Sequence, residues 1–403
     1  MGTSGSNKSG QEMQNFNDFT TGKTVITEEE KTYRYVYLWY DDPEDPDDPE
    51  ATADDFIKEG DSVGLKGFKV DVQGAYSDLE DGVRYIYDGM SDKKIRKFKI
   101  DENTLVFVRA PVTKRKAWSD FLTQLERAGV VCVNTRACME ITSDKYRTSL
   151  YLAEAELNQP KTVLVHHPEK AIPAMKRLGG KYPVILKTLT GSLGIGVIKV
   201  DSESSLHSTV QLLYKLDPNM GVLLQEMIKD FTFDIRAHVI GGKFHGAIKR
   251  PVVAKDFRSN VSLGSVPSPI KLTQLEIEHV EKAAKAVDGL WVGVDIFPSK
   301  DRDNEPPIFI EINSTPGTKG YRKATGENLA KNILVKFKNR DYWLKPNTYK
   351  SMFEDKIQTD SMEFDGDIVK WSKDGMQYEH NIIGISDKNP IIEHNSIEVE
   401  LLR

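Results

Sequence analysis

Hydrophobic positions in the first third of the chain follow the pattern of a small α/β domain. Residues 33–40 (YRYVYLWY) and 105–109 (LVFVR) are rich in aromatic and β-branched side chains, which favours buried strands. Residues 117–128 have the spacing of an amphipathic helix, and residues 130–133 (VVCV) have the pattern of another strand. A strand, a helix and a strand at this spacing form a βαβ unit, so we expect residues 31–140 to contain a mostly parallel sheet.

From residue 143 onward the pattern changes to a helix, a strand, a glycine-rich loop, a second helix and several longer strands. Near the C-terminus, strand patterns at 368–371 and 376–385 flank Lys373-Asp374-Gly375, which is a hairpin signal, and residues 397–402 predict a third strand. The expected fold class is therefore α/β (α+β). We divide the chain into a disordered tail (1–30), a small α/β domain (31–140), a larger domain (141–343), a linker (344–362) and a small β module (363–403).

The composition is that of a globular protein, with 403 residues, 39% hydrophobic, 29% charged and a formal net charge of −6. The apolar runs are far shorter than the roughly 20 residues that cross a bilayer. The first residues lack the apolar segment of a signal peptide, and two cysteines are too few for a disulfide framework, so we expect a cytoplasmic protein. The mildly acidic balance argues against bulk nucleic-acid binding.

Residues 41–55 form an acidic segment, with nine acidic side chains and three prolines in fifteen positions. Self-repulsion and the missing proline donors predict an extended, solvated loop. The segment could also hold a cation or a basic partner, but carboxylates spaced by prolines seldom converge on one ion.

A candidate phosphate site lies where the strand pattern at 182–187 (YPVILK) ends in Lys187 and enters a loop with Gly191, Gly194 and Gly196. Glycines let backbone N–H groups approach phosphate oxygens, and the lysine adds a positive charge for the same anion. The loop matches neither the P-loop nor the Rossmann spacing. A plain hairpin is the alternative interpretation.

A candidate cation site lies on two later strand patterns. Residues 308–313 (IFIEIN) predict a strand in which Glu311 and Asn313 share one face, while isoleucines 308, 310 and 312 share the other. Asp295 is the single acid in the apolar run 291–297, where an unpaired carboxylate would be costly. A divalent metal such as Mg²⁺ would satisfy these oxygens, and pairing of Asp295 with a Lys or Arg is the alternative.

Basic residues gather between these elements. Lys249, Arg250, Lys255 and Arg258 lie within ten positions, against the single acid Asp256. Arginine suits bidentate binding of phosphate or carboxylate, so this cluster predicts an anionic substrate, with a solvated basic strand and loop as the alternative.

Other reactive side chains show no catalytic pattern. Cys132 and Cys138 lack the spacing of a redox pair, and we do not expect them to act as nucleophiles. The histidines lack metal-ligand spacing and are expected to be structural or solvated: His166, His167, His207, His238, His245 and His279.

In this order, several motifs resemble the ATP-grasp carboxylate–amine ligases, and among them the ribosomal-protein glutamate ligase RimK and its relatives. The motifs are SDK at 143–145, ILK followed by GSLGIGV, QEMI, DIR, DFRSN, and VDIF followed by FIEINSTPG. The resemblance runs from about residue 106 to 338. It implies an ATP-grasp fold preceded by a pre-ATP-grasp domain, with the small β module as an addition.

The resemblance also implies roles at the matching positions. Nucleotide contacts are implied for Lys145, Lys187, Gly191, Ser192, Gly194, Gly196, Gln225, Glu226, Met227, Ile228, Asp234, Ser259 and Asn260. Catalytic contacts to phosphate or acyl phosphate are implied for Arg236, Arg250 and Arg258, and substrate contacts for Arg109 and Arg250. Ligands of Mg²⁺ (or Mn²⁺) are implied to be Asp295, Glu311 and Asn313.

The implied reaction is phosphorylation of a carboxylate by ATP, followed by attack of an amine on the acyl phosphate. The implied partners are an amino-acid donor, plausibly glutamate, and a peptide or protein amine, with a homo-oligomer left open and no membrane or specific nucleic acid expected. Two alternatives stay open, namely a small-molecule peptide ligase of the same fold and a nucleotide-binding regulatory or scaffold module. The sequence departs from the RimK pattern at Lys249 and at 261–265 (VSLGS), so the donor and acceptor are not fixed by it.

Overall fold

The computed structural model forms two compact units, Met1–Leu344 and Lys345–Arg403, which we describe separately. The residues that it describes are 24–27, 34–40, 49–80, 83–91, 94–100, 104–190, 196–229, 231–252, 266–339, 356–366, 368–373, 376–386, 389–394 and 397–402. None of the helices in these ranges is both long and apolar enough to span a bilayer.

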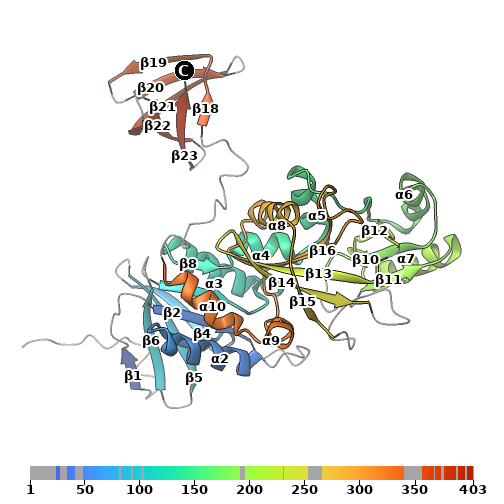
Figure 1. Cartoon of the computed structure of the whole chain (residues 1–403). Coiled ribbons are helices and arrows are strands. Elements are labelled where there is room, and N and C mark those ends of the chain that lie inside the picture. Colours follow the sequence, from blue (N-terminus) through green and yellow to red (C-terminus); the bar gives the residue numbers. More distant parts are fainter. Residues whose placement is uncertain are drawn as a thin grey trace, which may run out of the picture. The chain divides into compact units, whose positions relative to one another are not determined.

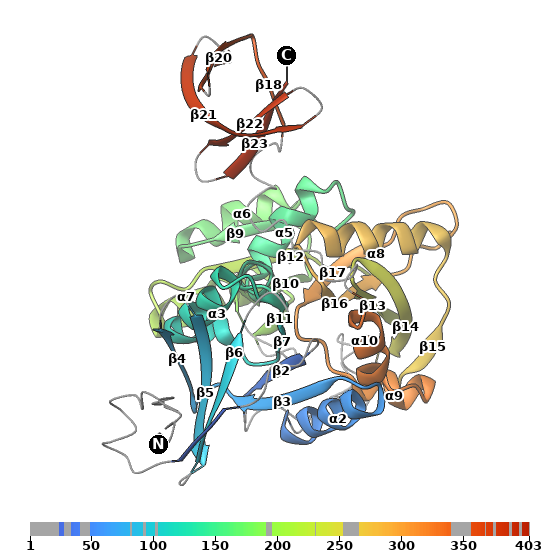
Figure 2. The same ribbon diagram turned by 90° about the vertical axis from the view of Figure 1, so that its left-hand side faces the viewer.

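The first unit begins with the predicted parallel sheet, in the order β3-β2-β7-β8. Its strands are β2 (Arg34–Trp39), β3 (Lys66–Asp71), β7 (Thr104–Val108) and β8 (Val131–Val133). Helix α2 (Pro49–Ser62) lies along β3, and helix α3 (Lys116–Arg127) covers the opposite face of the sheet (Figure 2). Every residue of β2 is buried, because the strand is covered on both faces.

Two predictions for this region are wrong. The acidic segment was expected to be an extended loop, but helix α2 begins at Pro49, and residues 41–48 lie outside the described residues. Proline is favoured at the first helical position, and acidic side chains near a helix N-terminus interact well with its dipole. The tail was expected to be disordered to residue 30, but Thr24–Thr27 form strand β1, which pairs in parallel with β6.

A second sheet that the sequence analysis did not predict has the order β1-β6-β5-β4. Its remaining strands are β4 (Ala75–Glu80), β5 (Val83–Ser91) and β6 (Lys94–Ile100). Ile86 and Ile100 from this sheet join the hydrophobic core beneath α3, so the sheet is part of the same packed unit.

The middle of the chain contains two antiparallel sheets (Figure 1). The first has the order β11-β10-β12-β9, and α6 and α7 pack on it. Its elements are β9 (Thr162–Val165), α6 (Ala171–Arg177), β10 (Val184–Thr188), β11 (Val197–Val200), α7 (Glu203–Leu216) and β12 (Val222–Glu226). Strand β10 corresponds to the predicted strand and ends at Thr188, one residue after Lys187, and most of the glycine-rich loop that follows lies outside the described residues.

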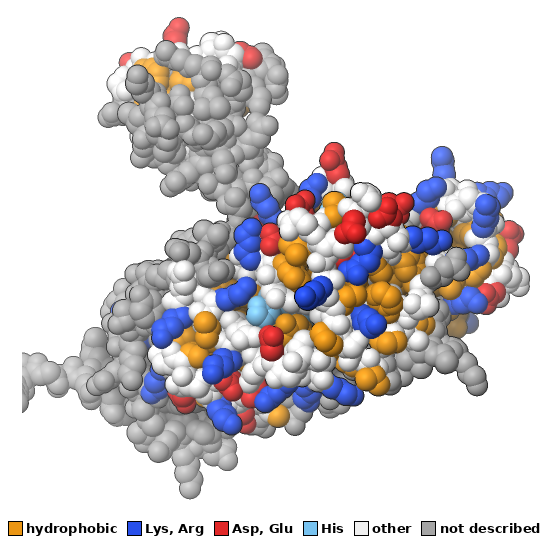
Figure 3. Space-filling model, viewed as in Figure 1, with side chains coloured by type: hydrophobic (Ala, Val, Ile, Leu, Met, Phe, Trp, Pro, Cys, Tyr) orange, Lys and Arg blue, Asp and Glu red, His pale blue; other side chains and the backbone are white. Residues whose placement is uncertain are grey.

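The other sheet has the order β15-β14-β13-β16-β17. Its strands are β13 (Phe233–Ile240), β14 (Lys243–Pro251), β15 (Ser268–Ile270), β16 (Trp291–Phe297) and β17 (Ile308–Asn313). The helices around it are α4 (Arg136–Ser143), α5 (Lys145–Glu154), α8 (Gln274–Ala286), α9 (Lys319–Thr325) and α10 (Leu329–Phe337), and short 3₁₀ turns occur at Val112–Lys114 and Pro168–Lys170. Charged side chains of both signs, with hydrophobic ones between them, cover the face shown in Figure 3.

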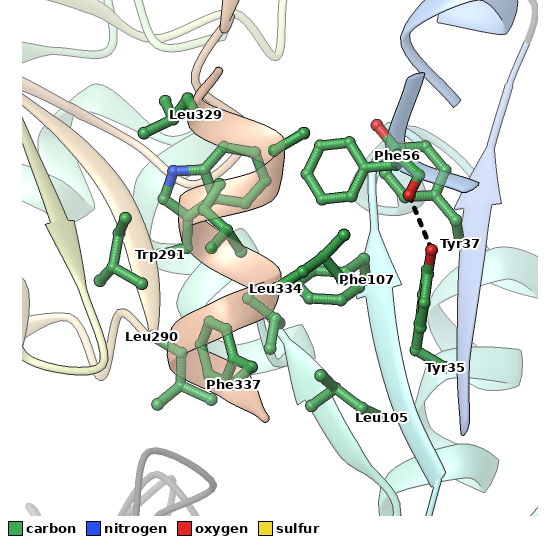
Figure 4. Packing of buried hydrophobic residues seen from close by; sticks show 14 of the residues in the cluster. Tyr35, Tyr37, Phe56, Leu105, Phe107, Leu290, Trp291, Leu329, Leu334 and Phe337 are labelled. Carbon is green, nitrogen blue, oxygen red and sulfur yellow. Dashed lines mark hydrogen bonds between the residues drawn. The ribbon is translucent and has the colours of Figure 1, made fainter. Parts of the chain in front are cut away.

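An aromatic core joins the parallel sheet to the sheet that contains β16 (Figure 4). The ring centroids of Phe56 and Trp291 are 5.8 Å apart, and those of Phe107 and Phe337 are also 5.8 Å apart. The predicted boundary at residue 140 falls inside helix α4, so the chain has no linker there. The two predicted domains therefore form one packed unit.

The second unit is a six-stranded sheet in the order β18-β23-β22-β21-β20-β19. Its strands are β18 (Lys356–Gln358), β19 (Ser361–Asp365), β20 (Ile368–Lys373), β21 (Met376–Ser386), β22 (Asn389–His394) and β23 (Ile397–Leu402). The predicted hairpin and third strand are present, but the predicted linker 344–362 is too long, because β18 and the start of β19 belong to the sheet. Met362 packs against the core that contains Trp371, which explains this earlier start.

Candidate active site

A row of charged side chains crosses the sheet from β14 to β17. In register, Asp234 lies opposite Arg250, Arg236 opposite Asp295, and Asp295 opposite Glu311. Asp234 and Arg236 are two residues apart on β13 and therefore share one face of the sheet. The row alternates in sign until it reaches Glu311.

Asp295 is the centre of this row. Its Oδ1 accepts a hydrogen bond from Arg236 Nε at 2.7 Å, and its Oδ2 accepts bonds from Arg236 Nη2 at 2.7 Å and from Arg250 Nη2 at 2.9 Å. Burial alone would raise the pKa of this carboxyl, but the two guanidinium groups hold it well below its usual range. The pairing of Asp295 with arginine, one of the two interpretations left open by the sequence, is present in the structure.

Arg250 is bound by carboxylates rather than exposed to a ligand. Its Nε and Nη2 donate to the two oxygens of Asp234, both at 2.7 Å, and its side chain is 4% exposed. The pKa of Arg250 is raised by Asp295 and Asp234, against the effect of burial. The structure therefore holds Arg250 and Asp234 as an internal pair, and their predicted contacts to substrate and nucleotide stay predictions.

Glu311 and Asn313 lie on β17 after a β-bulge. The register shifts between Asp295 and Ile296, and both Phe309 and Ile312 are buried in the core. The prediction that isoleucines 308, 310 and 312 share one face is therefore wrong, because the bulge breaks the alternation. Glu311 and Asn313 both follow the bulge and keep the common face that the sequence predicted.

Lys145 and Lys187, on two other elements, lie close enough to Glu311 to interact with it electrostatically. Lys145 is the first residue of α5, and Lys187 lies near the end of β10. Burial lowers the pKa of Lys187 to about 8, with Glu311 opposing this shift and Lys145 adding to it. The pKa of Lys145 is lowered too, chiefly by burial, with Glu311 opposing. Both cations are thus held with incomplete solvation, which favours an anionic ligand beside them.

The donor set of Asp295, Glu311 and Asn313 fits a hard divalent cation. Two carboxylates and an amide oxygen are the ligands that Mg²⁺ takes when phosphate oxygens complete its shell. Nδ2 of Asn313 is buried without a hydrogen-bond partner, so no described group competes for this amide. Among the described residues no group of three His, Cys, Asp or Glu side chains is placed to hold a metal ion. The described side chains therefore do not form a complete set of metal ligands by themselves.

The glycine-rich loop is anchored by its last residue. Gly196 has φ of +78°, and a Cβ there would collide with Thr188 Oγ1, so this position requires glycine. Thr188 N donates to Gly196 O at 2.9 Å and closes the base of the loop. Other predicted ligands lie outside the described residues: Gly191, Ser192, Gly194, Arg258, Ser259 and Asn260.

The predicted nucleotide contacts at residues 225–228 lie at the end of β12 and directly after it. Gln225 is buried, and its Nε2 donates to Thr162 Oγ1 at 2.9 Å. The backbone N–H of Glu226 donates to Lys161 O at 2.9 Å, so this donor is already used. Met227 and Ile228 are half-buried. The carbonyl of Glu226 and the backbone of Ile228 are the groups left for a base.

Arg109 follows β7 of the parallel sheet, and its contact with substrate stays a prediction. Its Nη2 donates to Pro316 O at 2.9 Å, and its guanidinium lies 4.6 Å from the ring centroid of Trp291. Nη1 of Arg109 is buried without a partner. The side chain thus brings an unused donor from the parallel sheet to the loop that follows Asn313.

Asn134 was missed by the sequence analysis. Its Nδ2 donates to Trp291 O at 2.6 Å and Ser314 O at 2.7 Å, and its Oδ1 accepts from Leu290 N at 2.8 Å and Trp291 N at 3.0 Å. These bonds join the end of β8 to the start of β16 and to the loop after β17. The only signal in the sequence was a polar residue directly after a buried strand.

Comparisons with known proteins agree with this geometry. The family model of the RimK-like ATP-grasp domain matches residues 142–337. A probable alpha-L-glutamate ligase of Marinomonas sp. (strain MWYL1) is 31% identical over 280 residues, which cover 69% of this chain and 88% of that protein.

Two solved structures show the same fold. The ATP-grasp ligase PsnB, complexed with a phosphomimetic variant of a minimal precursor, Mg and ADP, has a TM-score of 0.57 and 15% identity, covering 77% of this chain and all (100%) of that one. The VanG D-Ala:D-Ser ligase of Enterococcus faecalis has a TM-score of 0.54 and 16% identity, covering 76% and 99%. The likeness supports the ATP-grasp assignment of the two middle sheets.

Proposed function

The chain belongs to the RimK-like ATP-grasp family and is a ligase of that family, and we propose that it uses ATP to join an amino acid to a peptide or protein amine. The observation that carries this proposal is the electrostatic interaction of two partly buried lysines, Lys145 and Lys187, with Glu311 at the end of the charged row. Two lysines from two elements and two carboxylates from two strands form one charged cluster. Such a cluster suits a nucleoside triphosphate with its metal ion.

The reaction has two steps. A substrate carboxylate oxygen attacks the γ-phosphorus of ATP, ADP leaves, and an acyl phosphate forms. An amine then attacks the acyl carbon, an amide forms, and inorganic phosphate leaves with the amine giving up a proton. Neither step needs a covalent enzyme intermediate, so positioning and charge neutralisation supply the catalysis.

Residues of the charged row and its surroundings have distinct parts in this mechanism. Lys145 and Lys187 bind phosphate oxygens, and the half-buried Arg236 presents its guanidinium beside Asp295 toward the transferred group. Arg250 keeps Asp234 and Asp295 in place, and Arg109 faces the substrate side with an unused donor. Arg258, Ser259 and Asn260 are proposed as further phosphate contacts.

Asp295, Glu311 and Asn313 are the proposed ligands of Mg²⁺ (or Mn²⁺). When bound, the ion neutralises phosphate charge and favours departure of ADP. Their carboxylates are already neutralised in part by Arg236, Arg250 and the two lysines, so we expect the ion to arrive with the nucleotide.

Glutamate is the proposed donor because the relative from Marinomonas is named a probable alpha-L-glutamate ligase. A peptide or protein is the proposed acceptor because the PsnB structure contains a precursor peptide variant. We place the reaction in the cytoplasm, where ATP and free amino acids are abundant. A dipeptide product would instead assign the chain as a small-molecule peptide ligase.

The test measures ADP released from ATP and Mg²⁺ with each amino acid, with and without a cell lysate, followed by the intact mass of products. We expect release with glutamate and a peptide or protein that gains glutamate residues. Glu311→Gln should abolish release, while Glu305→Gln, on an exposed loop, should leave it unchanged. A wild-type protein that binds ATP but releases no ADP with any amino acid, with or without lysate, would refute the proposed function.

A further inference from the structure

His238 lies next to the charged row, at the following position of β13 on the same face of the sheet. On β13 it is two residues beyond Arg236, and in register it lies opposite Gly246 on β14 and Gly293 on β16. Gly293 is in turn opposite Asn313. The imidazole therefore occupies the same face of the sheet as Arg236.

The ring of His238 is enclosed without a hydrogen bond. Its side chain is fully buried, and neither Nδ1 nor Nε2 has a partner. The ring packs edge to face against Tyr321, with centroids 5.1 Å apart. A Cβ at Gly246 would collide with Tyr321 Oη, and one at Gly293 would lie 2.8 Å from Pro316 Cβ, so the slot around the ring is tight.

A buried imidazole without partners is unfavourable for stability, whereas a phenyl ring of similar shape would carry no such penalty. Burial and the nearby positive charges of Arg236 and Arg109 also lower the pKa of His238 to about 3, so the ring is neutral at physiological pH. A neutral imidazole has one nitrogen that can accept a hydrogen bond. The residue thus keeps an acceptor in a place where the described structure uses none.

Arg236 is the hydrogen-bond donor that we consider for this acceptor nitrogen of His238. Its bonds to Asp295 use both carboxylate oxygens, and Arg250 takes a further position on Oδ2. A carboxylate offers about four lone-pair positions, and these three bonds leave one, so a cation that binds both oxygens must displace one of the bonds. If Asp295 turns toward a metal, Arg236 loses part of its pairing inside a poorly solvated site.

We propose that His238 is a positioning residue, whose unprotonated nitrogen accepts a hydrogen bond from Arg236 when Asp295 engages the metal of a bound metal–nucleotide complex. This inference rests on the proposed function, since it assumes a metal–nucleotide complex at the charged row. His238 then holds the Arg236 guanidinium in place while its carboxylate partner is shared.

The test compares His238→Phe, His238→Gln and the control His245→Phe. His245 also packs on Tyr321, with ring centroids 6.0 Å apart, but lies outside the site. The measurements are the melting temperature and the affinity for ADP by calorimetry, with and without Mg²⁺. These readouts need no turnover.

We expect the Phe variant to melt no lower than wild type and to bind ADP alone as wild type does. We expect its affinity for ADP with Mg²⁺ to fall about tenfold. The Gln variant, which keeps an acceptor, should recover most of that loss, and the control should match wild type. In an Arg236→Lys background the Phe substitution should have no further effect on binding with Mg²⁺.

Unchanged affinity of the Phe variant in the presence of Mg²⁺ would overturn the proposal, as would a Gln variant no better than Phe. A loss that persists in full in the Arg236→Lys background would also overturn it, because His238 would then not act through Arg236. A Phe variant that melts well below wild type would indicate a packing role instead. Absence of wild-type turnover would refute the proposed function, while these binding results would still decide the role of His238.

Discussion

Replacement of Arg250 by methionine tests whether this residue supports the site or binds substrate. Its guanidinium makes three hydrogen bonds to the buried carboxylates of Asp234 and Asp295, at 2.7, 2.7 and 2.9 Å. Removal of one partner of a buried ion pair leaves an uncompensated charge and costs about 3–5 kcal/mol. A domain has only about 5–15 kcal/mol of stability in total, so Arg250→Met should destabilise the first unit severely.

The assay is equilibrium urea unfolding of wild type and variants, with the midpoint and slope both fitted. The matched control is Lys243→Met on the same strand, because Lys243 pairs with Glu281 at 3.1 Å while 69% exposed. This surface pair should contribute less than about 1 kcal/mol. A double variant, Asp234→Asn with Arg250→Met, should recover part of the stability, because it also removes the charge of the carboxylate to which Arg250 makes two of its bonds.

A different result would refute this reasoning. If Arg250→Met loses less than about 1 kcal/mol while the KM for the amino acid rises at least tenfold, Arg250 contacts substrate, as the sequence predicted.

Three further predictions concern pH and packing. Nucleotide affinity should weaken as pH rises through about 8, because the pKa of Lys187 is lowered to about 8 and the side chain loses its charge there. Calorimetry of ADP binding should detect proton uptake at pH 8, and Lys187→Arg should abolish this pH dependence. Asp288 has φ of +52° and a pKa raised to about 6 by burial, so its charge destabilises the folded state above pH 6. Asp288→Asn should raise the free energy of unfolding at pH 7.5 by on the order of 1 kcal/mol, measured as a higher melting temperature, and have no such effect at pH 4. Asn134→Ala should lower the free energy of unfolding by about 3–5 kcal/mol, since four backbone groups lose their hydrogen-bond partner. The control Asn332→Ala, at a more exposed residue, should cost under about 1 kcal/mol, and equal losses would contradict the role of Asn134.

Local patterns in the sequence carried most of the elements that build the site. Strands β2 and β7 were predictable because each is a nearly continuous apolar run, and β16 and β17 because few polar residues interrupt their apolar ones. The common face of Glu311 and Asn313 was predictable from strand alternation. The bulge before Glu311 was not, because it depends on how β17 registers against β16.

Pairings between distant residues were beyond the reach of these patterns. Arg250 and Asp234 are sixteen positions apart, and Arg236 and Asp295 are fifty-nine apart. Only the sheet order β14-β13-β16 brings them into one row, so the sequence predicted Arg250 as a substrate ligand rather than as an internal partner. Asn134 was missed for the same reason, because its partners are the backbone groups of strands more than 150 positions away.

Helix α2 shows a different kind of error. Its first turns contain the last part of the acidic segment that predicted an extended loop, but Ala53 and Phe56 are buried in the core beneath β2. Tertiary packing of these two side chains outweighs the local charge repulsion.

The central claim is that a carboxylate is activated as an acyl phosphate, and oxygen-isotope transfer tests it most directly. The measurement uses glutamate labelled with ¹⁸O in its carboxylates, together with ATP, Mg²⁺ and the acceptor found by the release assay, and determines the mass of the released phosphate. The account predicts ADP and phosphate that carries one ¹⁸O atom, with none from Glu311→Gln. Unlabelled phosphate, or AMP with pyrophosphate, would contradict it.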